Sequence, residues 1–303
     1  MNYLKAKAMP ITKTRRSLLP NFITIIFLLP FLLNFLFFWL WPICASFFLA
    51  FFSFNPLAPA QTSFIGLGNF ITLLEDEAFK KAVVNTLAFV IVTIPITTAM
   101  ALFLALWINN LKWAQEFFQA AYFIPSLISM VVLATIFKIL YATHGPLNQS
   151  LHFFGFFVRE SCLNNPKTAL WAIMAMDIWS AVGYYCLLFI AGLRNIDPQL
   201  YEAAEIDGAS YWQQFLYITL PLLQPVFLFI VVINSIRSFQ IFNEIYVMTQ
   251  GGPLYATTTM VYDLYETAFQ KLEMGKACAK GYFLILVISV FTFIEFQYQK
   301  SKA

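Results

Sequence analysis

A strongly apolar stretch of this sequence carries four polar side chains at helical spacing: Asn234, Arg237, Gln240 and Glu244. At 100° per residue the four lie within about 120° of one another, so a continuous helix would present them as one polar stripe. An ionisable group at membrane depth costs at least ~2.5 kcal/mol and normally faces a cavity or an opposite charge. The stripe therefore predicts either a pathway that hydrogen-bonds a polyol or an anion, or an internal ion pair. In the second case Arg237 pairs with Glu244 or with Asp177, and both interpretations stay open.

A second candidate site is the interval 201–225, which is polar and helix-prone between two apolar stretches. Its first part contains six residues suited to contact with another protein: Glu202, Ala203, Ala204, Asp207, Gly208 and Ala209. The small alanines allow a partner surface to approach closely, and the carboxylate of Glu202 can pair with a partner arginine. Gly208 readily takes the left-handed backbone that ends a helix, so its turn would fix the angle between two short helices.

The ends of these two short helices are also predicted. Asp197 followed by Pro198 is typical of an N-cap with proline at the first helical position. Ser210 with Gln213 three residues later is typical of a capping box. We therefore expect a helix, a glycine turn and a second helix lying against the membrane.

The composition places the elements that hold these residues in a lipid bilayer. Of 303 residues 60% are hydrophobic and 11% are charged, against about 25% charged in soluble domains. The net charge of +3 is modest, and no basic run interleaved with aromatic residues predicts nucleic-acid binding. The four cysteines form no C-x-x-C pair, and His144 and His152 lack companion ligands, so we expect no metal site.

Six stretches approach the ~20 apolar residues that span a bilayer. They predict an all-α integral membrane protein with an N-terminal segment, 1–21, and a transmembrane domain, 22–303, whose spans lie at about 22–54, 82–107, 117–137, 168–193, 215–248 and 281–298. The first is far longer than the core of a signal peptide, so we expect a retained span that bends near Pro30 or Pro42.

The orientation of the spans rests on the N-terminal segment, which has five basic residues and no acidic one. The positive-inside rule predicts that it is cytoplasmic. Six spans then place both termini and the interval 201–225, between the fourth and fifth spans, on the cytoplasmic side. The charges of the loops give little evidence for either orientation, since the inner segments hold nine Lys and Arg residues and the outer loops hold eight.

The spacing within 201–225 resembles the EAA loop of binding-protein-dependent ABC transporter permeases. That pattern is E-A-A, two residues, D-G-A, then an apolar series ending in L-P and a later P. The matching residues are Glu202, Ala203, Ala204, Asp207, Gly208, Ala209, Phe215, Ile218, Leu220, Pro221 and Pro225. The interval is called the EAA loop below. In addition, 239–253 is similar to the segment F-D-x-I-Y-V-M-T-x-G-G-P of carbohydrate-type permeases, although Asn243-Glu244 departs from it.

The resemblance implies a permease subunit of an ABC importer in a bacterial cell membrane, carrying a sugar or glycerol phosphate. Its expected partners are a second permease, two ATP-binding subunits and an extracytoplasmic substrate-binding protein, besides membrane lipid. ATP and Mg would be used by the ATP-binding subunits, because the sequence has no G-x-x-x-x-G-K-[ST]. We therefore expect no cofactor and no enzymatic activity in this chain. The EAA loop would dock in a groove of the ATP-binding subunit.

Other functions remain compatible with the composition. An autonomous ion-coupled secondary transporter would use the charged stripe as an ion relay, and a membrane scaffold would have no pathway at all. Neither of these requires an EAA loop. An importer of the same family for a non-sugar substrate does require it.

Overall fold

The computed structural model describes residues 22–111, 113–153 and 160–300. The N-terminal segment 1–21, on which the predicted orientation rests, lies outside these residues. So do Lys112, Arg159 and Lys302, three of the residues in the charge count, and the side chain of His152. The chain divides into two compact units, Met1–Phe48 and Leu49–Ala303.

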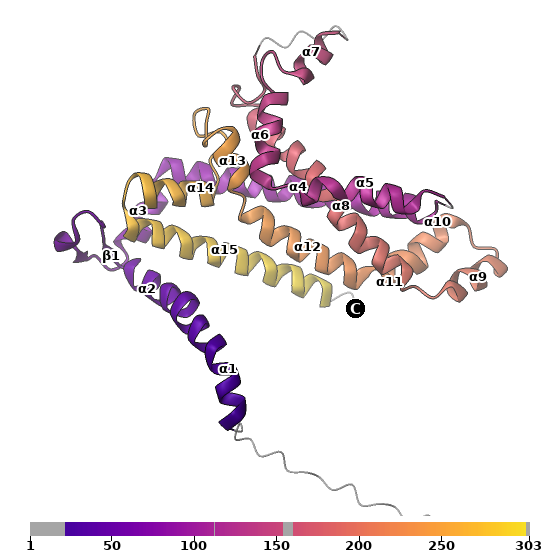
Figure 1. The fold of residues 1–303 in the computed structure, drawn as a ribbon, viewed down its shortest axis with the longest axis horizontal. Coiled ribbons are helices and arrows are strands. Elements are labelled where there is room, and N and C mark those ends of the chain that lie inside the picture. Colours follow the sequence, from indigo (N-terminus) through magenta and orange to yellow (C-terminus); the bar gives the residue numbers. More distant parts are fainter. Residues whose placement is uncertain (1–21, 112, 154–159, 301–303) are drawn as a thin grey trace, which may run out of the picture. The chain divides into compact units, whose positions relative to one another are not determined.

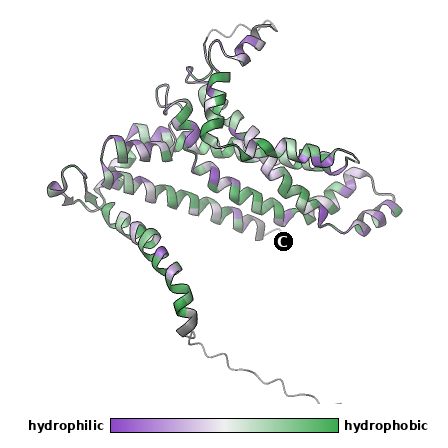
Figure 2. Ribbon diagram, viewed as in Figure 1, coloured by the Kyte–Doolittle hydropathy of each residue, from purple (hydrophilic) through white to green (hydrophobic). Residues whose placement is uncertain are grey.

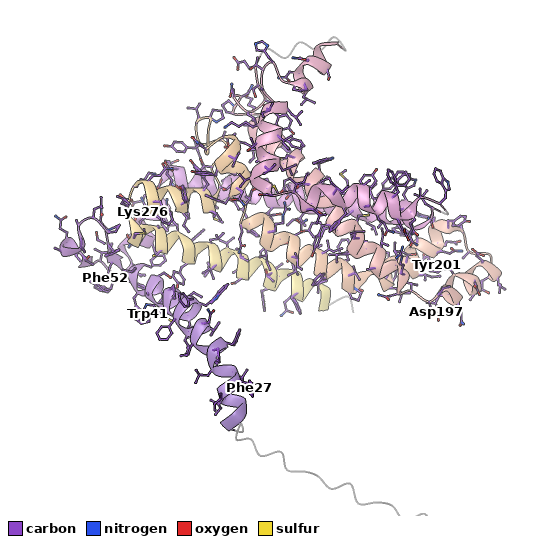
Figure 3. The ribbon with its side chains drawn as sticks, in the orientation of Figure 1. Phe27, Trp41, Phe52, Asp197, Tyr201 and Lys276 are labelled. Carbon is purple, nitrogen blue, oxygen red and sulfur yellow. The ribbon has the colours of Figure 1, made fainter. Side chains whose placement is uncertain are left out.

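The described part of the first unit is a continuous apolar helical stretch. It consists of α1 (Phe22–Phe35), the π-helical turn η1 (Leu36–Leu40) and α2 (Trp41–Leu49), whose last residue already belongs to the second unit. The π-helical turn ends two residues before Pro42, which has no N–H with which to continue the α-helical pattern. Large apolar side chains such as Phe27 and Trp41 are exposed along it (Figure 3), as expected of a helix in lipid.

The second unit is a helical bundle with a small two-stranded hairpin. Its elements are β1 (Phe52–Ser53), η2 (Pro59–Gln61), β2 (Ser63–Phe64), α3 (Gly68–Glu75), α4 (Glu77–Asn109), α5 (Gln115–Leu127), α6 (Met130–Leu140), α7 (Pro146–Phe153), α8 (Ala169–Arg194), α9 (Pro198–Ile206), α10 (Tyr211–Gln214), η3 (Phe215–Thr219), α11 (Leu220–Leu222), α12 (Gln224–Phe239), α13 (Asn243–Met248), α14 (Met260–Tyr265), η4 (Glu266–Gln270) and α15 (Met274–Lys300). Strands β1 and β2 pair antiparallel.

Helix α8 forms the centre of this bundle, since it packs against α4, α5 and α12 and is buried on most of its surface (Figure 1). Hydrophobic residues predominate along the long helices, whereas hydrophilic residues gather in α9 (Figure 2). Helix α9 and the hairpin lie at opposite ends of the second unit: Asp197 and Tyr201 mark one end, and Phe52 and Lys276 mark the other (Figure 3). The EAA loop is therefore far from the hairpin.

Among the described residues, five helices are long and apolar enough to cross a membrane, and the bent pair α5–α6 would make a sixth. The predicted third span, 117–137, is thus not one straight helix, because α5 and α6 meet at 93°. Pro125 removes a donor from the last turn of α5, and Ile128 and Ser129 then take extended backbone. The predicted helical, membrane-spanning class agrees with the structure at this coarser level.

The predicted fifth span, 215–248, is also interrupted. It comprises η3, α11, α12 and α13, with non-helical backbone at Gln240 and Phe242. The carbonyl of Ile241, which lies in the break, accepts a hydrogen bond from the Thr259 hydroxyl at 3.1 Å. The break therefore has its own internal support, as non-helical backbone at membrane depth requires.

A buried charge cluster lies where α15 begins. The Lys280 ammonium pairs with Asp263 of α14, donates to the Thr267 hydroxyl at 2.8 Å and lies 3.8 Å from Asp76. Lys276 pairs with Asp76 at 3.1 Å. These pairs offset the charge of the two lysines, so both can lie in the first turns of α15. The helix begins at Met274, seven residues before the predicted start of the last span.

The two acids of the cluster have opposite pKa shifts. Burial raises the pKa of Asp263 and outweighs the favourable charge of Lys280. Burial acts in the same direction on Asp76, but the hydrogen bond from Lys276 and the charge of Lys280 outweigh it and lower the pKa of that carboxyl. Asp263 thus depends on Lys280 for its ionised form.

Gly183 permits the close approach of α8 and α5. A Cβ atom at this position would lie 1.8 Å from the carbonyl oxygen of Tyr122. We expect Gly183→Ala to lower the midpoint of thermal unfolding of the purified protein in detergent by several degrees, since overpacking costs about 1–3 kcal/mol. The control is Gly281→Ala, whose Cβ would make an ordinary contact with Leu264 at 3.4 Å. Equal midpoints for the two variants would contradict the role of Gly183.

Candidate functional site

The first helix of the EAA loop, α9, has the ends that the sequence predicts. The Asp197 carboxylate accepts a hydrogen bond from the Gln199 N–H at 3.0 Å, and Pro198 is the first helical residue. At the other end Gly208 has φ of +78°. The N–H of Gly208 donates to the carbonyl of Glu205 at 3.0 Å, and that of Ala209 to the carbonyl of Ala204 at 2.9 Å. This is a Schellman motif, which fixes the turn after α9.

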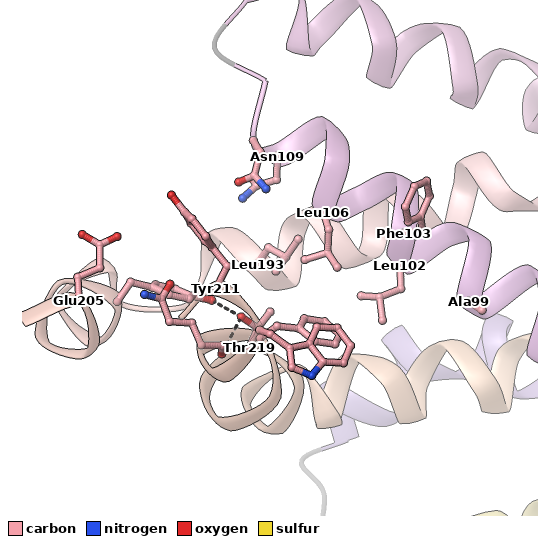
Figure 4. Close-up of a pocket in the computed structure, with 14 residues that line it drawn as sticks. Ala99, Leu102, Phe103, Leu106, Asn109, Leu193, Glu205, Tyr211 and Thr219 are labelled. Carbon is pink, nitrogen blue, oxygen red and sulfur yellow. Dashed lines mark hydrogen bonds between the residues drawn. The ribbon is translucent and has the colours of Figure 1, made fainter. Parts of the chain in front are cut away.

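The second helix of the loop begins with the predicted capping box. The backbone N–H of Ser210 donates to the Gln213 side-chain oxygen at 2.8 Å, and that of Gln213 donates to the Ser210 hydroxyl at 3.4 Å. The hydroxyls of Tyr201 and Thr219 lie within hydrogen-bonding distance at 2.9 Å and tie α9 to η3 (Figure 4). Both short helices are therefore held at a defined angle.

Most of the residues predicted to contact a partner lie on the surface. Glu202, Ala203, Asp207 and Gly208 are exposed, whereas Ala204 and Ala209 are half-buried. Ile206 is a further exposed residue that the sequence analysis did not select, with 87% of its surface accessible at the end of α9. An apolar side chain between Glu205 and Asp207 was the available signal, because an exposed apolar residue in a polar segment indicates a contact surface.

A groove of about 1180 Å³ lies beside the EAA loop (Figure 4). Phe103 and Leu106 of α4 and Leu193 of α8 line one side, and Tyr211 and Thr219 of the loop line the other. Helix α8 leads directly into the loop, since only Asn195, Ile196 and Asp197 separate it from α9. The loop is thus continuous with the central helix of the bundle.

The polar stripe lies elsewhere, around the break between α12 and α13. The guanidinium of Arg237 makes two hydrogen bonds to the carboxylate of Asp177 on α8, one of them at 3.3 Å. Asp177 is almost fully buried, with 3% of its side chain exposed, whereas 33% of the Arg237 side chain is exposed. The internal ion pair that the sequence left open is therefore present with Asp177 as the partner.

Three of the four stripe residues come together despite the interrupted helix. Arg237, Gln240 and Glu244 line a pocket of about 460 Å³ at the α12–α13 break. Asn234 does not line this pocket; it is fully buried, and its side-chain amide has no hydrogen-bond partner among the described residues. Phe242 of the break and Asn243, the first residue of α13, were not selected from the sequence and complete the aromatic and polar parts of the lining. We call this pocket the α12–α13 pocket.

Comparison with known proteins shows similarity over nearly the whole chain. Residues 77–299 match the family described as "Binding-protein-dependent transport system inner membrane component". The arabinooligosaccharides transport system permease protein of Bacillus subtilis (strain 168) is 36% identical over 89% of this chain and 86% of its own length. The lactose transport system permease protein of Rhizobium radiobacter is 34% identical over 77% of this chain and 80% of its length.

Two further similarities concern transport of anions. The sn-glycerol-3-phosphate transport system permease protein of Yersinia pestis is 30% identical over 88% of this chain and 90% of its length. A chain in the crystal structure of a bacterial ABC transporter for the acidic polysaccharide alginate superposes with a TM-score of 0.80 at 27% identity, covering 92% of this chain and 95% of its own. A second structure of that transporter contains an alginate pentasaccharide-bound periplasmic protein.

Proposed function

Because residues 77–299 match the family over most of the chain, the protein belongs to the binding-protein-dependent transport system inner membrane components, and we propose that it is the permease subunit of an ATP-driven sugar importer. Its relatives are permeases of sugar ABC importers, which confirms the resemblance to the carbohydrate branch. The family's location confirms the predicted cell-membrane protein. Permease subunits of this family are not themselves enzymes.

The observation that carries this proposal is the geometry of the EAA loop. Two short helices are joined by a fixed glycine turn, and the outer face of the first presents Glu202, Ala203 and Ile206 to solvent. We assign this face to a groove of an ATP-binding subunit. The carboxylate suits a partner arginine, the alanine allows close approach, and Ile206 suits an apolar pocket. A loop held so rigidly can pass movement of that subunit to α8.

The complete importer in this proposal has five protein components of four kinds. Two ATP-binding subunits use ATP and Mg, a second permease pairs with this chain, and an extracytoplasmic binding protein delivers the sugar, while this chain binds no cofactor of its own. Both termini and the EAA loop face the cytoplasm, with segment 1–21 inside and 22–303 as the transmembrane domain. In support, the described end of α15 and the EAA loop lie toward the same end of the second unit (Figure 1).

The test is uptake by the importer purified through a tag on this chain and reconstituted in liposomes with its binding protein. We expect a second permease and an ATP-binding subunit to copurify, and we expect sugar uptake that depends on ATP. Uptake by this chain alone, without ATP or any partner, would instead support an autonomous secondary transporter.

The contact assigned to Ile206 makes a separate prediction. We expect Ile206→Asp to weaken binding of the ATP-binding subunit by about thirtyfold, and to reduce its copurification and ATP-driven uptake accordingly, because truncating or charging a buried interface anchor costs about 2 kcal/mol or more. The matched control is Tyr217→Ser, which removes another exposed apolar side chain from the same region outside the contact face. Normal copurification and uptake in Ile206→Asp would exclude this residue from the contact.

A further inference from the structure

We propose that the α12–α13 pocket selects uncharged, hydroxyl-rich cargo and discriminates against anions, because the positive charge in it is already neutralised from within the chain. This inference rests on the proposed function and narrows its substrate. Relatedness alone does not decide the matter, since the similar proteins include permeases for arabinooligosaccharides and lactose and others for glycerol phosphate and alginate.

The first step concerns Arg237. Of the residues that line the pocket it is the one with a basic side chain, and two of its five N–H donors are held by Asp177. Asp177 does not line the pocket; it lies almost fully buried on α8, behind the guanidinium. An anionic cargo would therefore meet an arginine whose charge is already compensated and whose partner is not displaced without leaving a buried carboxylate.

The second step concerns the remaining charge in the pocket. Glu244 lines the same pocket, is buried, and is close enough to Arg237 to interact with it electrostatically. Taken together, Arg237, Asp177 and Glu244 carry a net charge of −1 when both acids are ionised and of zero when Glu244 is protonated. Neither state attracts a phosphate or a carboxylate.

The third step is the match to hydroxyl groups. Arg237 keeps N–H donors that Asp177 does not use, Glu244 offers acceptor oxygens, and the amides of Gln240 and Asn243 offer both. A sugar hydroxyl both donates and accepts, so it can use every group in this set. Phe242 adds an aromatic surface to the same lining. The pocket is thus suited to a polyol without a formal charge.

The experiment compares cargo of both charge classes in the reconstituted importer with its binding protein. The neutral probes are arabinotriose, lactose and maltotriose, and the anions are sn-glycerol 3-phosphate and an alginate trisaccharide. We expect ATP-driven uptake of a neutral sugar, no uptake of either anion, and no inhibition of neutral uptake by a large excess of anion. Uptake of an anion would overturn the inference while leaving the importer function intact, whereas uptake of no probe would overturn both.

Asp177→Asn tests the cause of the discrimination. This variant removes the hydrogen-bonded carboxylate from Arg237 and makes the net charge of the group more positive by one, so anions should inhibit neutral uptake at concentrations about tenfold lower than in the unchanged protein, as a gained charge-assisted hydrogen bond implies. The double variant D177N/R237Q removes the freed charge and should lose this inhibition again. Equal sensitivity to anions in all three proteins would contradict the role of Asp177. If Asp177→Asn does not assemble, the comparison of probes in the unchanged protein still decides the inference.

Discussion

Gly208→Val is expected to reduce ATP-driven uptake by more than tenfold while the importer still assembles and hydrolyses ATP. Gly208 has φ of +78°, a region in which a β-branched residue is a strong outlier. No atom lies within 4 Å of a Cβ built at this position, so the effect comes from the backbone and not from a clash. Valine would pull the turn out of its left-handed conformation, break the Schellman hydrogen bonds and change the angle between α9 and α10. The ATP-binding subunit would then close without moving the permease.

The matched control for this prediction is Gly208→Asn. Asparagine adopts the left-handed conformation far more readily than valine, and the open space at the position accommodates its side chain. We therefore expect Gly208→Asn to keep most of the uptake. ATP hydrolysis and sugar uptake are measured in the same proteoliposomes, and the ratio of the two rates reports coupling. Equal ratios in the valine and asparagine variants would refute the assignment of a rigid turn to Gly208.

Lys280→Met is expected to cause the largest loss of stability. It leaves the carboxylate of Asp263 fully buried without its cation and removes the donor to Thr267. Breaking a buried ion pair by removing one partner costs about 3–5 kcal/mol, which should appear as a large fall in the midpoint of thermal unfolding in detergent. Lys276→Met is the control, because its pair with Asp76 is partly exposed and is worth at most about 1 kcal/mol.

The pH dependence of Lys280→Met has a definite sign. Burial raises the pKa of Asp263 above its ordinary value of 3.8, so the folded state holds this proton more tightly than the unfolded state. The corresponding stability is present below the ordinary pKa and is lost as pH rises through the folded-state pKa. The deficit of Lys280→Met should therefore shrink as the pH is lowered towards 4, and Asp263→Asn introduced into the same variant should restore much of the stability at neutral pH. A deficit that does not change with pH would point to lost packing instead.

The features that could be predicted from the sequence are those determined by neighbouring residues. The N-cap at Asp197, the left-handed Gly208 and the capping box at Ser210 each depend on contacts within five residues, and all three are confirmed. The pairing of Arg237 could be narrowed only to two carboxylates, because Asp177 lies 60 residues away in the chain. Tertiary packing decided between them.

The sequence did not locate the interruptions of the predicted spans. Pro125 lies close to Ile128, and Gln240 and Glu244 flank Ile241, but a continuous membrane helix tolerates such residues, so they do not by themselves indicate a break. Each break is supported by residues distant in the sequence. The Thr259 hydroxyl donates a hydrogen bond to the Ile241 carbonyl, and Gly183 of α8 lets the backbone of α5 pack closely at Tyr122. Such support is a property of the folded bundle and not of the local sequence.

Helix α8 connects the beginning of the EAA-loop region to Asp177, the residue that pairs with Arg237 at the α12–α13 pocket. Asp177 and Arg194 lie on the same helix, α8, 17 residues apart, which corresponds to about 26 Å along its axis. The two glycines of this helix are both packed closely: Gly183 lies against the backbone at Tyr122, and Gly192 lies against Leu223 and Val226. A tilt of about 5° at the loop would then shift the Asp177 carboxylate sideways by ~2 Å over that length, enough to break a hydrogen bond to Arg237. In the proposed importer, the movement that the ATP-binding subunit imposes on α8 would therefore also weaken the hydrogen bonds between Asp177 and Arg237. ATP-driven movement and release of the sugar from the α12–α13 pocket would then occur together.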